Sequence, residues 1–280
     1  MLLTNYHSHT HFSDGKSKPS DYIEKAIEYG LAAYGFSCHA PVPFPCNWSI
    51  APEMLKDYLN EIDTLKRQYK DKIEIYKSLE IDYFPGNPLA LPSNYKALNL
   101  DYTIGSVHFV DNLKNGEAWN IDTSKRIFED GMIEIFGGDG KKAVTKFYEI
   151  TLEMLDVMQP DIIGHLDKIK MFNSGEKYFS ENEHWYKNLV ETVLQKIAKN
   201  NTIVEVNTRG IYRGKTADYY PSNQILSRCK ELNIPVMINT DCHKPEEITL
   251  GISEATNLLI GLGYKTLRVL LGNKWRDIEI

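Results

Sequence analysis

The feature that most constrains the fold of this chain is a regular alternation of short apolar, often β-branched runs with longer segments of helical periodicity. Alternation of this kind is typical of strand–helix units that build a parallel sheet. We therefore expect an α/β fold in which helices join successive strands. The candidate strands are Leu2–Tyr6, Ala33–Ser37, Ile73–Leu79, Tyr102–Val107, Ile162–Gly164, Ile203–Asn207 and Val236–Thr240.

Six segments have the apolar spacing of amphipathic helices. They cover Pro19–Tyr29, Pro52–Tyr69, Lys141–Met158, Glu183–Asn200, Pro221–Leu232 and Ser253–Leu262. Three of these segments begin with proline, which helices tolerate best in their first turn. The chain has 280 residues and shows neither an internal repeat nor a linker-like tract, so we expect a single domain over residues 1–280.

Residues 111–140 interrupt this alternation, because they combine five glycines with scattered apolar residues and only a weak helical pattern. A stretch of this length in a compact domain is usually functional when it is ordered. We therefore predict an insertion that lies over the functional site. A second irregular stretch, His39–Pro52, holds four of the twelve prolines and indicates a stiff loop.

Histidine and acidic residues recur where the candidate strands end. Six of the eight histidines in the chain follow this rule. In a closed parallel barrel the carboxyl ends of all strands lie on one face, so we expect these side chains to converge on a single site. The residues concerned are His7, His9, His39, Glu80, His108, His165, Asp241 and His243.

The composition of this set indicates a site for divalent metal ions. In extended backbone His7 and His9 point to one side, as do Asp241 and His243, so each pair can chelate one ion. Imidazole suits zinc, iron or manganese, and a carboxylate such as Glu80 can bridge two ions. So many ligands fit two or three ions better than one. Such ions lower the pKa of bound water from about 15.7 towards ~7 and hold phosphoryl oxygens, which favours hydrolysis of a phosphate ester.

The overall charge argues against several other classes of protein. A formal net charge of −6 and a pI near 5.8 are unfavourable for coating nucleic acid or an anionic membrane surface. No basic N-terminal segment precedes an apolar run, and no apolar stretch approaches the ~20 residues that span a bilayer. We expect a cytoplasmic enzyme with a small substrate and without nucleic-acid or membrane partners. A phosphate-bearing substrate then needs a local positive site.

The ligand-type residues lie in motifs that resemble those of the polymerase and histidinol phosphatase (PHP) superfamily. The opening N-Y-H-S-H-T-H-F-S-D-G is similar to the first motif of that family, with Asp14 at a further ligand position. The resemblance spans nearly the whole chain, and it implies a distorted (β/α)7 barrel with a trinuclear metal centre. The remaining motifs follow in order as S-C-H-A at His39, S-L-E-I-D at Glu80, G-S-V-H-F at His108, G-H-L-D at His165 and N-T-D-C-H at Asp241 and His243.

The same resemblance implies how these ligands are shared among three ions. His11 also follows the first strand, but the family motif does not require histidine there, so its role as a ligand stays open. The implied sets are His7, His9, Glu80 and Asp241 for one ion, Glu80, His108 and His165 for a second, and Asp14, His39 and His243 for a third.

Two further stretches resemble the histidinol-phosphate phosphatase branch of the family, E-V-N-T-R-G-I-Y-R-G and G-H-L-D-K-I-K-M-F-N. This resemblance implies hydrolysis of L-histidinol phosphate to L-histidinol and phosphate in histidine biosynthesis. Arg209 and Arg213 follow the sixth candidate strand on the same barrel face. Guanidinium groups bind phosphate oxygens bidentately, so the two arginines are candidates for the local positive site.

Our mechanistic hypothesis is in-line attack on phosphorus by a metal-bridging hydroxide. The leaving alkoxide needs a proton, which His39, Asp241 or His243 would position or supply. Two alternatives remain open: a PHP-type nuclease or nucleotide phosphatase, and a non-catalytic metal-binding accessory module. A nuclease should show a basic track with interleaved aromatic residues, and we find none in the sequence.

The sequence is least informative about the organic part of the substrate. Trp48, Trp119 and Tyr212 lie in or near candidate site loops and are candidates for stacking on an imidazole ring. Glu117 and Asp122 are candidates for pairing with a substrate ammonium group. Each of these residues is more often a packing or solvated residue than a substrate contact.

Overall fold

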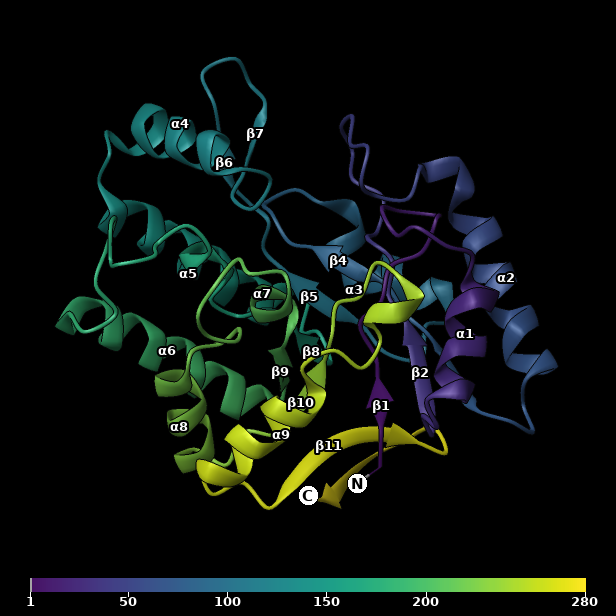
Figure 1. The fold of residues 1–280 in the computed structure, drawn as a ribbon. Helices are drawn as coiled ribbons and strands as arrows, with labels where there is room; N and C mark the ends of the chain where they lie inside the picture. The colour runs from purple at the N-terminus through teal and green to yellow at the C-terminus, as the bar shows by residue number, and fades with distance from the viewer. Residues whose placement is uncertain (1) are drawn as a thin grey trace.

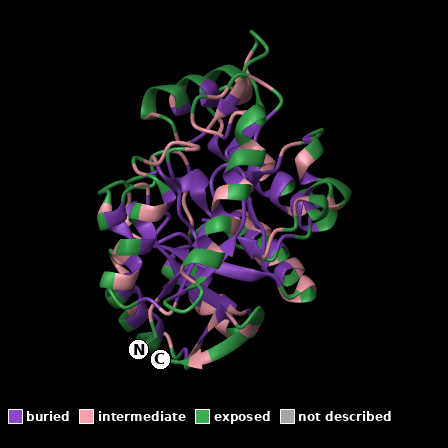
Figure 2. Ribbon diagram, turned by 90° about the vertical axis from the view of Figure 1, so that its right-hand side faces the viewer, coloured by how far each residue is buried: buried purple, intermediate pink, exposed green. Residues whose placement is uncertain are grey.

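The computed structural model describes residues 2–280 and has strands in the middle and helices around them (Figure 1). All seven predicted strands form, most of them shorter than predicted. Figure 2 shows the buried residues gathered along these strands, with exposed residues on the outer helix faces. The central strands are β1 (Thr4–Asn5), β2 (Ala33–Phe36), β3 (Glu74–Lys77), β4 (Glu80–Asp82), β5 (Ile104–Ser106), β8 (Ile162–Ile163), β9 (Ile203–Asn207) and β10 (Val236–Asn239).

These strands form two parallel sheets, of order β1-β2-β3 and β10-β9-β8-β5-β4. The sheets meet at two places. The bridge between His39 and Glu80 joins them where β3 leads into β4, and the parallel bridge between Ser8 and Cys242 joins the ends of β1 and β10. The result is an α/β fold of two parallel sheets arranged in the order expected for a distorted (β/α)7 barrel, and within residues 2–280 single bridges rather than ladders join the two sheets.

The third predicted strand, Ile73–Leu79, is divided in two, and this corrects the position of Glu80. Residues 74–77 pair with β2, whereas residues 80–82 pair with β5. The chain changes partner at Ser78 and Leu79, where the Ile104 N–H donates to the Leu79 carbonyl at 3.1 Å. Glu80 therefore begins β4 instead of ending the preceding strand.

Most of the predicted helices form within two residues of the expected ends, because their apolar spacing matches a buried face. In α6, for example, Tyr186, Val190, Val193 and Ile197 are buried at intervals of three or four residues. A 3-10 turn, η1 (Pro52–Met54), begins the second predicted helix, and α8 begins two residues after Pro221. The six helices are α1 (Pro19–Glu28), α2 (Leu55–Gln68), α5 (Gly140–Val157), α6 (His184–Asn200), α8 (Asn223–Glu231) and α9 (Ile252–Gly261).

Short helical turns lie in the loops between these elements. Two of them follow strand ends at the site: α7 (Arg209–Tyr212) after β9, and η5 (Pro245–Glu247) beyond β10. The others are η2 (Pro88–Ala90), α3 (Pro92–Tyr95), η3 (Lys96–Leu98) and η4 (Lys168–Lys170). Within residues 2–280, none of the helices combines the length and the apolarity that crossing a bilayer requires.

The segment over residues 111–140 is more regular than its sequence indicated. It consists of a hairpin, β6 (Phe109–Asn112) with β7 (Ala118–Asn120), followed by the helix α4 (Lys125–Phe136), at the top of Figure 1. Trp119 is fully buried under this helix, and a side chain at Gly131 would collide with its indole ring. Gly131 thus lets the helix pack closely on Trp119, and for this reason a glycine interrupts an otherwise helical pattern.

A second hairpin, β11 (Thr266–Leu271) with β12 (Lys274–Glu279), was not expected from the sequence and covers the other end of the barrel. The Tyr6 hydroxyl donates to the Leu270 carbonyl at 2.8 Å. Tyr102 and Trp275 pack around the Tyr6 ring. The end of the barrel opposite the predicted site is therefore closed by aromatic and aliphatic side chains.

Candidate metal centre

The structure brings the nine predicted ligands together, eight of them after the carboxyl ends of strands and Glu80 at the start of β4. They come from six separate segments, and seven of them are buried, whereas Asp14 and His243 are partly exposed. Three groups of ligand atoms each lie within 4.8 Å of one another. The groups are His7, His9 and Asp241; His39, Glu80 and His108; and His9, Asp14, His39 and His243.

Glu80 lies at the centre of this arrangement and uses both carboxylate oxygens. Its Oε2 atom lies 3.2 Å from His7 Nε2 and 2.9 Å from His39 Nδ1. Its Oε1 atom lies 2.9 Å from His165 Nε2 and 3.8 Å from His108 Nε2. A carboxylate with imidazoles on both sides is placed to bridge two ions.

His9 lies between two of the groups. Its Nε2 atom is 3.2 Å from Asp241 Oδ1, and its ring centroid is 4.2 Å from that of His39 and 4.3 Å from that of His243. Asp14 faces the same group, with its Oδ2 atom 2.9 Å from His243 Nε2. The geometry therefore adds His9 to the set that the family resemblance implied for the third ion, while the assignment of ligands to ions stays a prediction.

Several of these buried ligand atoms have no hydrogen-bond partner within the described part of the chain. Buried polar atoms are satisfied in the great majority of cases, because an unpaired one costs about 1–3 kcal/mol. Imidazole nitrogens and carboxylate oxygens left unpaired together are the donors that divalent cations such as zinc take. The residues therefore fit metal ions. The unpaired atoms are His7 Nε2, His9 Nδ1 and Nε2, Asp14 Oδ1, His39 Nδ1, Glu80 Oε2 and His165 Nδ1.

Electrostatics hold His9 and Glu80 in their metal-binding forms, whereas despite burial the neighbouring carboxylates raise the pKa values of His7, His39 and His108, so metal ions would displace protons from these three rings. Burial, together with the neighbouring His39 and His243, lowers the pKa of His9 to about 3, so its imidazole is neutral at pH 7. Burial opposes ionisation of Glu80, but the surrounding histidines hold the pKa of its carboxyl well below the usual value. Neutral imidazole and ionised carboxylate are the forms that bind metals.

Two further carboxylates, which were not identified from the sequence, each lie against the Nδ1 atom of a candidate ligand histidine. Glu205 in β9 lies 2.6 Å from His7 Nδ1, and Asp82 in β4 lies 2.6 Å from His108 Nδ1. Carboxylates in this position fix the tautomer and the ring orientation of ligating histidines. The signal was present in the sequence as acidic residues inside apolar strands, where a buried charge needs a partner.

Two of the candidate ligands have unusual backbone conformations. The φ angle is +24° at His165 and +50° at Asp241, in the left-handed region that side chains rarely adopt. Such strain costs about 1–3 kcal/mol and is concentrated at functional sites. It turns both side chains toward the cluster at the point where β8 and β10 end.

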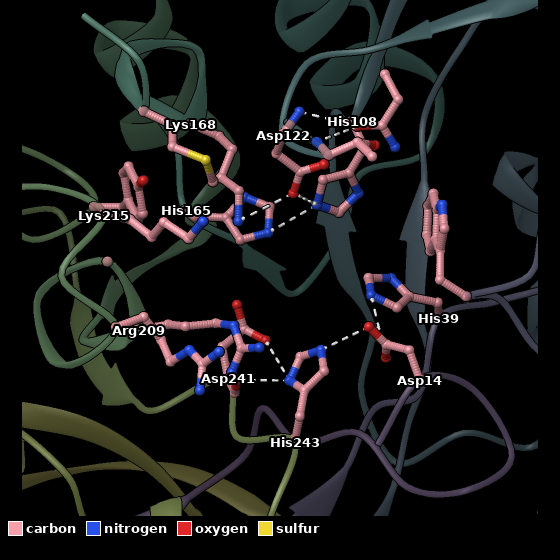
Figure 3. Close-up of a pocket in the computed structure, with 17 residues that line it drawn as sticks. Asp14, His39, His108, Asp122, His165, Lys168, Arg209, Lys215, Asp241 and His243 are labelled. Carbon is pink, nitrogen blue, oxygen red and sulfur yellow. Dashed lines mark hydrogen bonds and ion pairs between the residues drawn. The ribbon is translucent and has the colours of Figure 1, made fainter. Parts of the chain in front are cut away.

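A cavity of about 260 Å³ opens beside the cluster (Figure 3). Lysine and arginine side chains line it together with His39, His108, His165 and His243. In Figure 3, Arg209 and Lys215 come from the side of the cavity opposite His39 and Asp14. The cationic lining residues are Lys168, Arg209, Arg213 and Lys215.

The two predicted arginines both line the cavity, but Arg209 is fixed in position and Arg213 is exposed. Arg209 Nη1 donates to the Asp241 carbonyl at 2.9 Å, so its position is fixed relative to a candidate ligand. The Arg213 side chain is 46% exposed and lies 3.5 Å from Glu247. Lys168 and Lys215, which the sequence analysis did not single out, complete the positive wall because η4 and the loop after α7 bring them to the site.

The aromatic and acidic candidates for substrate contacts divide into those that line the cavity and those that do not. Trp48 lines the cavity and its ring stands edge-on to that of His39, with centroids 4.5 Å apart. Trp119 is fully buried under α4, and the Tyr212 hydroxyl donates to the Thr240 carbonyl at 2.9 Å, so both are structural. Asp122, a predicted candidate for the substrate ammonium group, does line the cavity and lies 3.3 Å from Lys168 Nζ.

Two of the remaining candidates lie outside the cavity. Glu117 lines a neighbouring surface groove, together with Phe44 and Phe84. The His11 side chain is exposed and packs against Phe12, with ring centroids 4.4 Å apart. Among residues 2–280, the groups of potential ligands do not include His11, so its geometry does not support a role as a ligand.

Comparison with known proteins identifies the family. The model of the PHP domain matches residues 5–209. The chain belongs to the PHP domain family. Its relatives include the histidinol-phosphatase of Bacillus subtilis, which is 26% identical over 89% of this chain and 96% of its own length. The histidinol-phosphatase of Lactococcus lactis subsp. lactis is 27% identical over 98% of this chain and 96% of its own length.

Solved structures of PHP proteins share the fold. The HisK protein of Listeria monocytogenes superposes with a TM-score of 0.77 at 22% identity, covering 90% of this chain and 99% of that chain. The histidinol phosphate phosphatase of Lactococcus lactis, in complex with zinc, L-histidinol and phosphate, superposes with a TM-score of 0.70 at 22% identity over 98% of both chains. These likenesses confirm the predicted α/β fold of parallel strands.

Proposed function

We propose that this PHP-family chain hydrolyses L-histidinol phosphate to L-histidinol and phosphate, a step of histidine biosynthesis, with divalent metal ions such as zinc. The observation that carries this proposal is one cavity lined both by residues of the metal-ligand cluster and by four cationic side chains. Relatives that match nearly the whole chain are histidinol-phosphatases, which supports the choice of substrate.

The cationic wall gives a phosphate dianion a place to bind in a chain whose net charge is −6. Arg209 is already oriented by the Asp241 carbonyl and by the Tyr212 hydroxyl, 3.1 Å away. Orienting a guanidinium in advance reduces the conformational entropy lost when it binds an anion. Arg213 and Lys215 are exposed enough to move onto phosphate oxygens that Arg209 does not reach.

Metal ions bound at the cluster would lower the pKa of a water molecule and neutralise charge on the phosphoryl oxygens. Their binding would involve the three groups of ligand atoms, together with His165, whose Nε2 atom lies 2.9 Å from Glu80 Oε1. The protein supplies the remaining chemistry through groups at the edge of the cavity. His39, Asp241 and His243 all line it, and we assign them the positioning or delivery of the proton that the leaving alkoxide takes up.

The organic part of the substrate has complementary groups in the same cavity. Trp48 presents an aromatic face against which an imidazole ring can pack. Asp122 provides a carboxylate for the substrate ammonium, and its distance of 3.3 Å from Lys168 keeps it oriented. A volume of about 260 Å³ suits a small amino alcohol better than a polynucleotide.

The test of this proposal is a comparison of kcat/KM values for the zinc-loaded protein. L-Histidinol phosphate should be turned over far faster than nucleoside monophosphates or single-stranded DNA. Preference for either nucleic-acid substrate would favour the PHP-type nuclease or nucleotide phosphatase. If the metal-loaded protein hydrolysed no phosphate ester, it would instead be a non-catalytic metal-binding module.

A further inference from the structure

The carboxylate of Glu205 is the most completely satisfied buried charge near the metal centre. The side chain is fully buried in β9. Its Oε1 atom lies 2.6 Å from His7 Nδ1 and accepts from Asn239 Nδ2 at 3.0 Å. Its Oε2 atom accepts from the His165 backbone N–H and from Asn207 Nδ2, each at 3.0 Å. Four donors therefore converge on the four acceptor positions of one carboxylate.

Other hydrogen bonds fix the direction in which the two asparagine amides point. The Asn239 Oδ1 atom accepts from the Tyr6 N–H at 2.8 Å, so its amide nitrogen must face Glu205. The Asn207 Oδ1 atom accepts from the Arg209 N–H at 3.0 Å, which turns its amide nitrogen to Glu205 as well. Because both amides are donors here, neither can substitute for Glu205 as the acceptor for His7.

This arrangement determines the tautomer of His7. Glu205 has only acceptor atoms when ionised, so the hydrogen of the neutral imidazole stands on Nδ1. The Nε2 lone pair is then free and lies 3.2 Å from Glu80 Oε2 and 3.8 Å from Asp241 Oδ1. It points into the group of ligands formed by His7, His9 and Asp241.

The second oxygen of Glu205 acts on a different ligand. It holds the backbone N–H of His165, the residue whose φ angle is +24°. That backbone conformation directs the His165 ring so that its Nε2 lies 2.9 Å from Glu80 Oε1, beside His108. Loss of this hydrogen bond would let the loop after β8 relax and would move the imidazole away from the group around Glu80.

We infer that Glu205 is a positioning residue that couples two metal positions, one at His7, His9 and Asp241 and the other at Glu80, His108 and His165. This inference rests on the proposed metal-dependent function. Because one rigid carboxylate orients a ligand of each position, a change at Glu205 disturbs both positions together. The residue is part of neither position and is not among the residues that line the cavity.

Asp82 provides the matched control. Its Oδ1 atom lies 2.6 Å from His108 Nδ1, the same distance as in the pair of Glu205 with His7, and its side chain is equally buried. It holds one of the candidate ligands, whereas Glu205 holds two. An Asp82→Asn variant should therefore weaken one metal position and leave the other intact.

The decisive experiment counts zinc ions per chain at a series of buffered free-zinc concentrations. Loss of an outer carboxylate weakens metal binding by roughly 10–100-fold. In the window where wild type keeps its full complement, Asp82→Asn should lack one ion and Glu205→Gln should lack two, because glutamine cannot accept four hydrogen bonds. A Glu205→Gln protein that lacks one ion or none would overturn the inference. Circular dichroism of the metal-free variants confirms that each is folded.

A second measurement does not depend on whether the variant folds. Nitrogen-15 NMR of the histidines in zinc-loaded wild type, in which the ring is neutral, should show His7 with its hydrogen on Nδ1 and none on Nε2, assigned by loss of the signal in His7→Gln. A hydrogen on Nε2 would contradict the positioning role. Neither measurement uses a substrate, so a failure to hydrolyse L-histidinol phosphate would refute the proposed function without touching the role of Glu205.

Discussion

The two ends of the barrel are built from the same strands and differ in every other respect. At the carboxyl ends, buried histidines and carboxylates face one another with ligand atoms left unpaired. At the opposite end, Tyr6, Tyr76 and Tyr102 pack with Leu270 and Trp275, and the Tyr6 hydroxyl donates to the Leu270 carbonyl. This fold obtains stability from its aromatic, apolar end and can therefore tolerate strain and unpaired polar groups at the other, polar end.

Removing a ligand from the polar end should have the largest effect on activity. His9 belongs to two of the three groups of ligand atoms, so His9→Ala should lower kcat/KM by on the order of 10³-fold or more, since several kcal/mol of charge stabilisation depend on the ions. The metal-free variant should lose less stability than a truncation in the apolar core, because the deleted ring is fully buried but has two unpaired nitrogens. Steady-state kinetics and urea unfolding measure the two effects. Activity within tenfold of wild type would contradict the assignment.

The apolar end should respond in the opposite way. Leu270 is 3% exposed, so Leu270→Ala should lower the free energy of unfolding by about 2–5 kcal/mol through lost burial and a residual cavity. The kcat/KM of the zinc-loaded variant, measured well below its Tm, should equal that of wild type. A variant of normal stability and impaired activity would show that the two ends are not independent.

The positive wall of the cavity should contribute less than the ligands. Lys215→Met removes one charge and keeps the aliphatic stem, and it should reduce kcat/KM roughly tenfold, because a hydrogen bond to a charged group contributes about 1.5–3 kcal/mol. Most of the change should be in KM. Lys142→Met on the exposed surface of α5 is the control and should leave both constants unchanged. Equal behaviour of the two variants would remove Lys215 from the phosphate site.

The smallest expected effect is a pH dependence of the Tm that arises at the polar end of the barrel. Burial would lower the pKa of His108, but Asp82 and Asp122 raise it to about 10. A histidine with a raised pKa contributes stability below its unfolded pKa of about 6.5 and loses it as pH rises towards 10. The Tm of metal-free protein should therefore fall by a few degrees between these values, whereas zinc, which needs the neutral ring, should remove the trend. A Tm of the metal-free protein that rises between pH 6.5 and 10 would contradict this prediction.

Much of the fold followed from periodicity. The strands before His7, His39, His108 and His165 were recognisable because short apolar runs in α/β proteins are buried on both faces. The division at Ser78 was not, since residues 73–79 form one continuous run and only the pairing of β4 with β5 separates them. The C-terminal hairpin was missed because it follows the last βα unit, where the alternation that guided the assignment has ended.

The candidate site was predictable as far as it depends on strand ends. A parallel barrel places those ends together, so the ligand-type residues after each strand could be grouped without knowledge of the loops. Lys168 and Lys215 could not be found in this way, because irregular turns bring them to the cavity. Asp122, in the segment over residues 111–140, was named as a candidate for the substrate ammonium group, but strand ends alone did not place it at the site. The role of Glu205 was hidden for a different reason, because its partners come from β9, β10 and the segments that follow β1 and β8.

Anomalous diffraction at the zinc edge, from crystals grown with zinc and phosphate, tests most directly whether the polar end of the barrel is a metal centre that binds phosphate. We predict at least two peaks within about 2.0–2.2 Å of nitrogen or oxygen atoms of the nine ligands, with Glu80 beside more than one peak. Phosphate should lie between these peaks and Arg209. Zinc peaks only outside the cluster, or phosphate bound away from Arg209 and Lys215, would contradict the assignment.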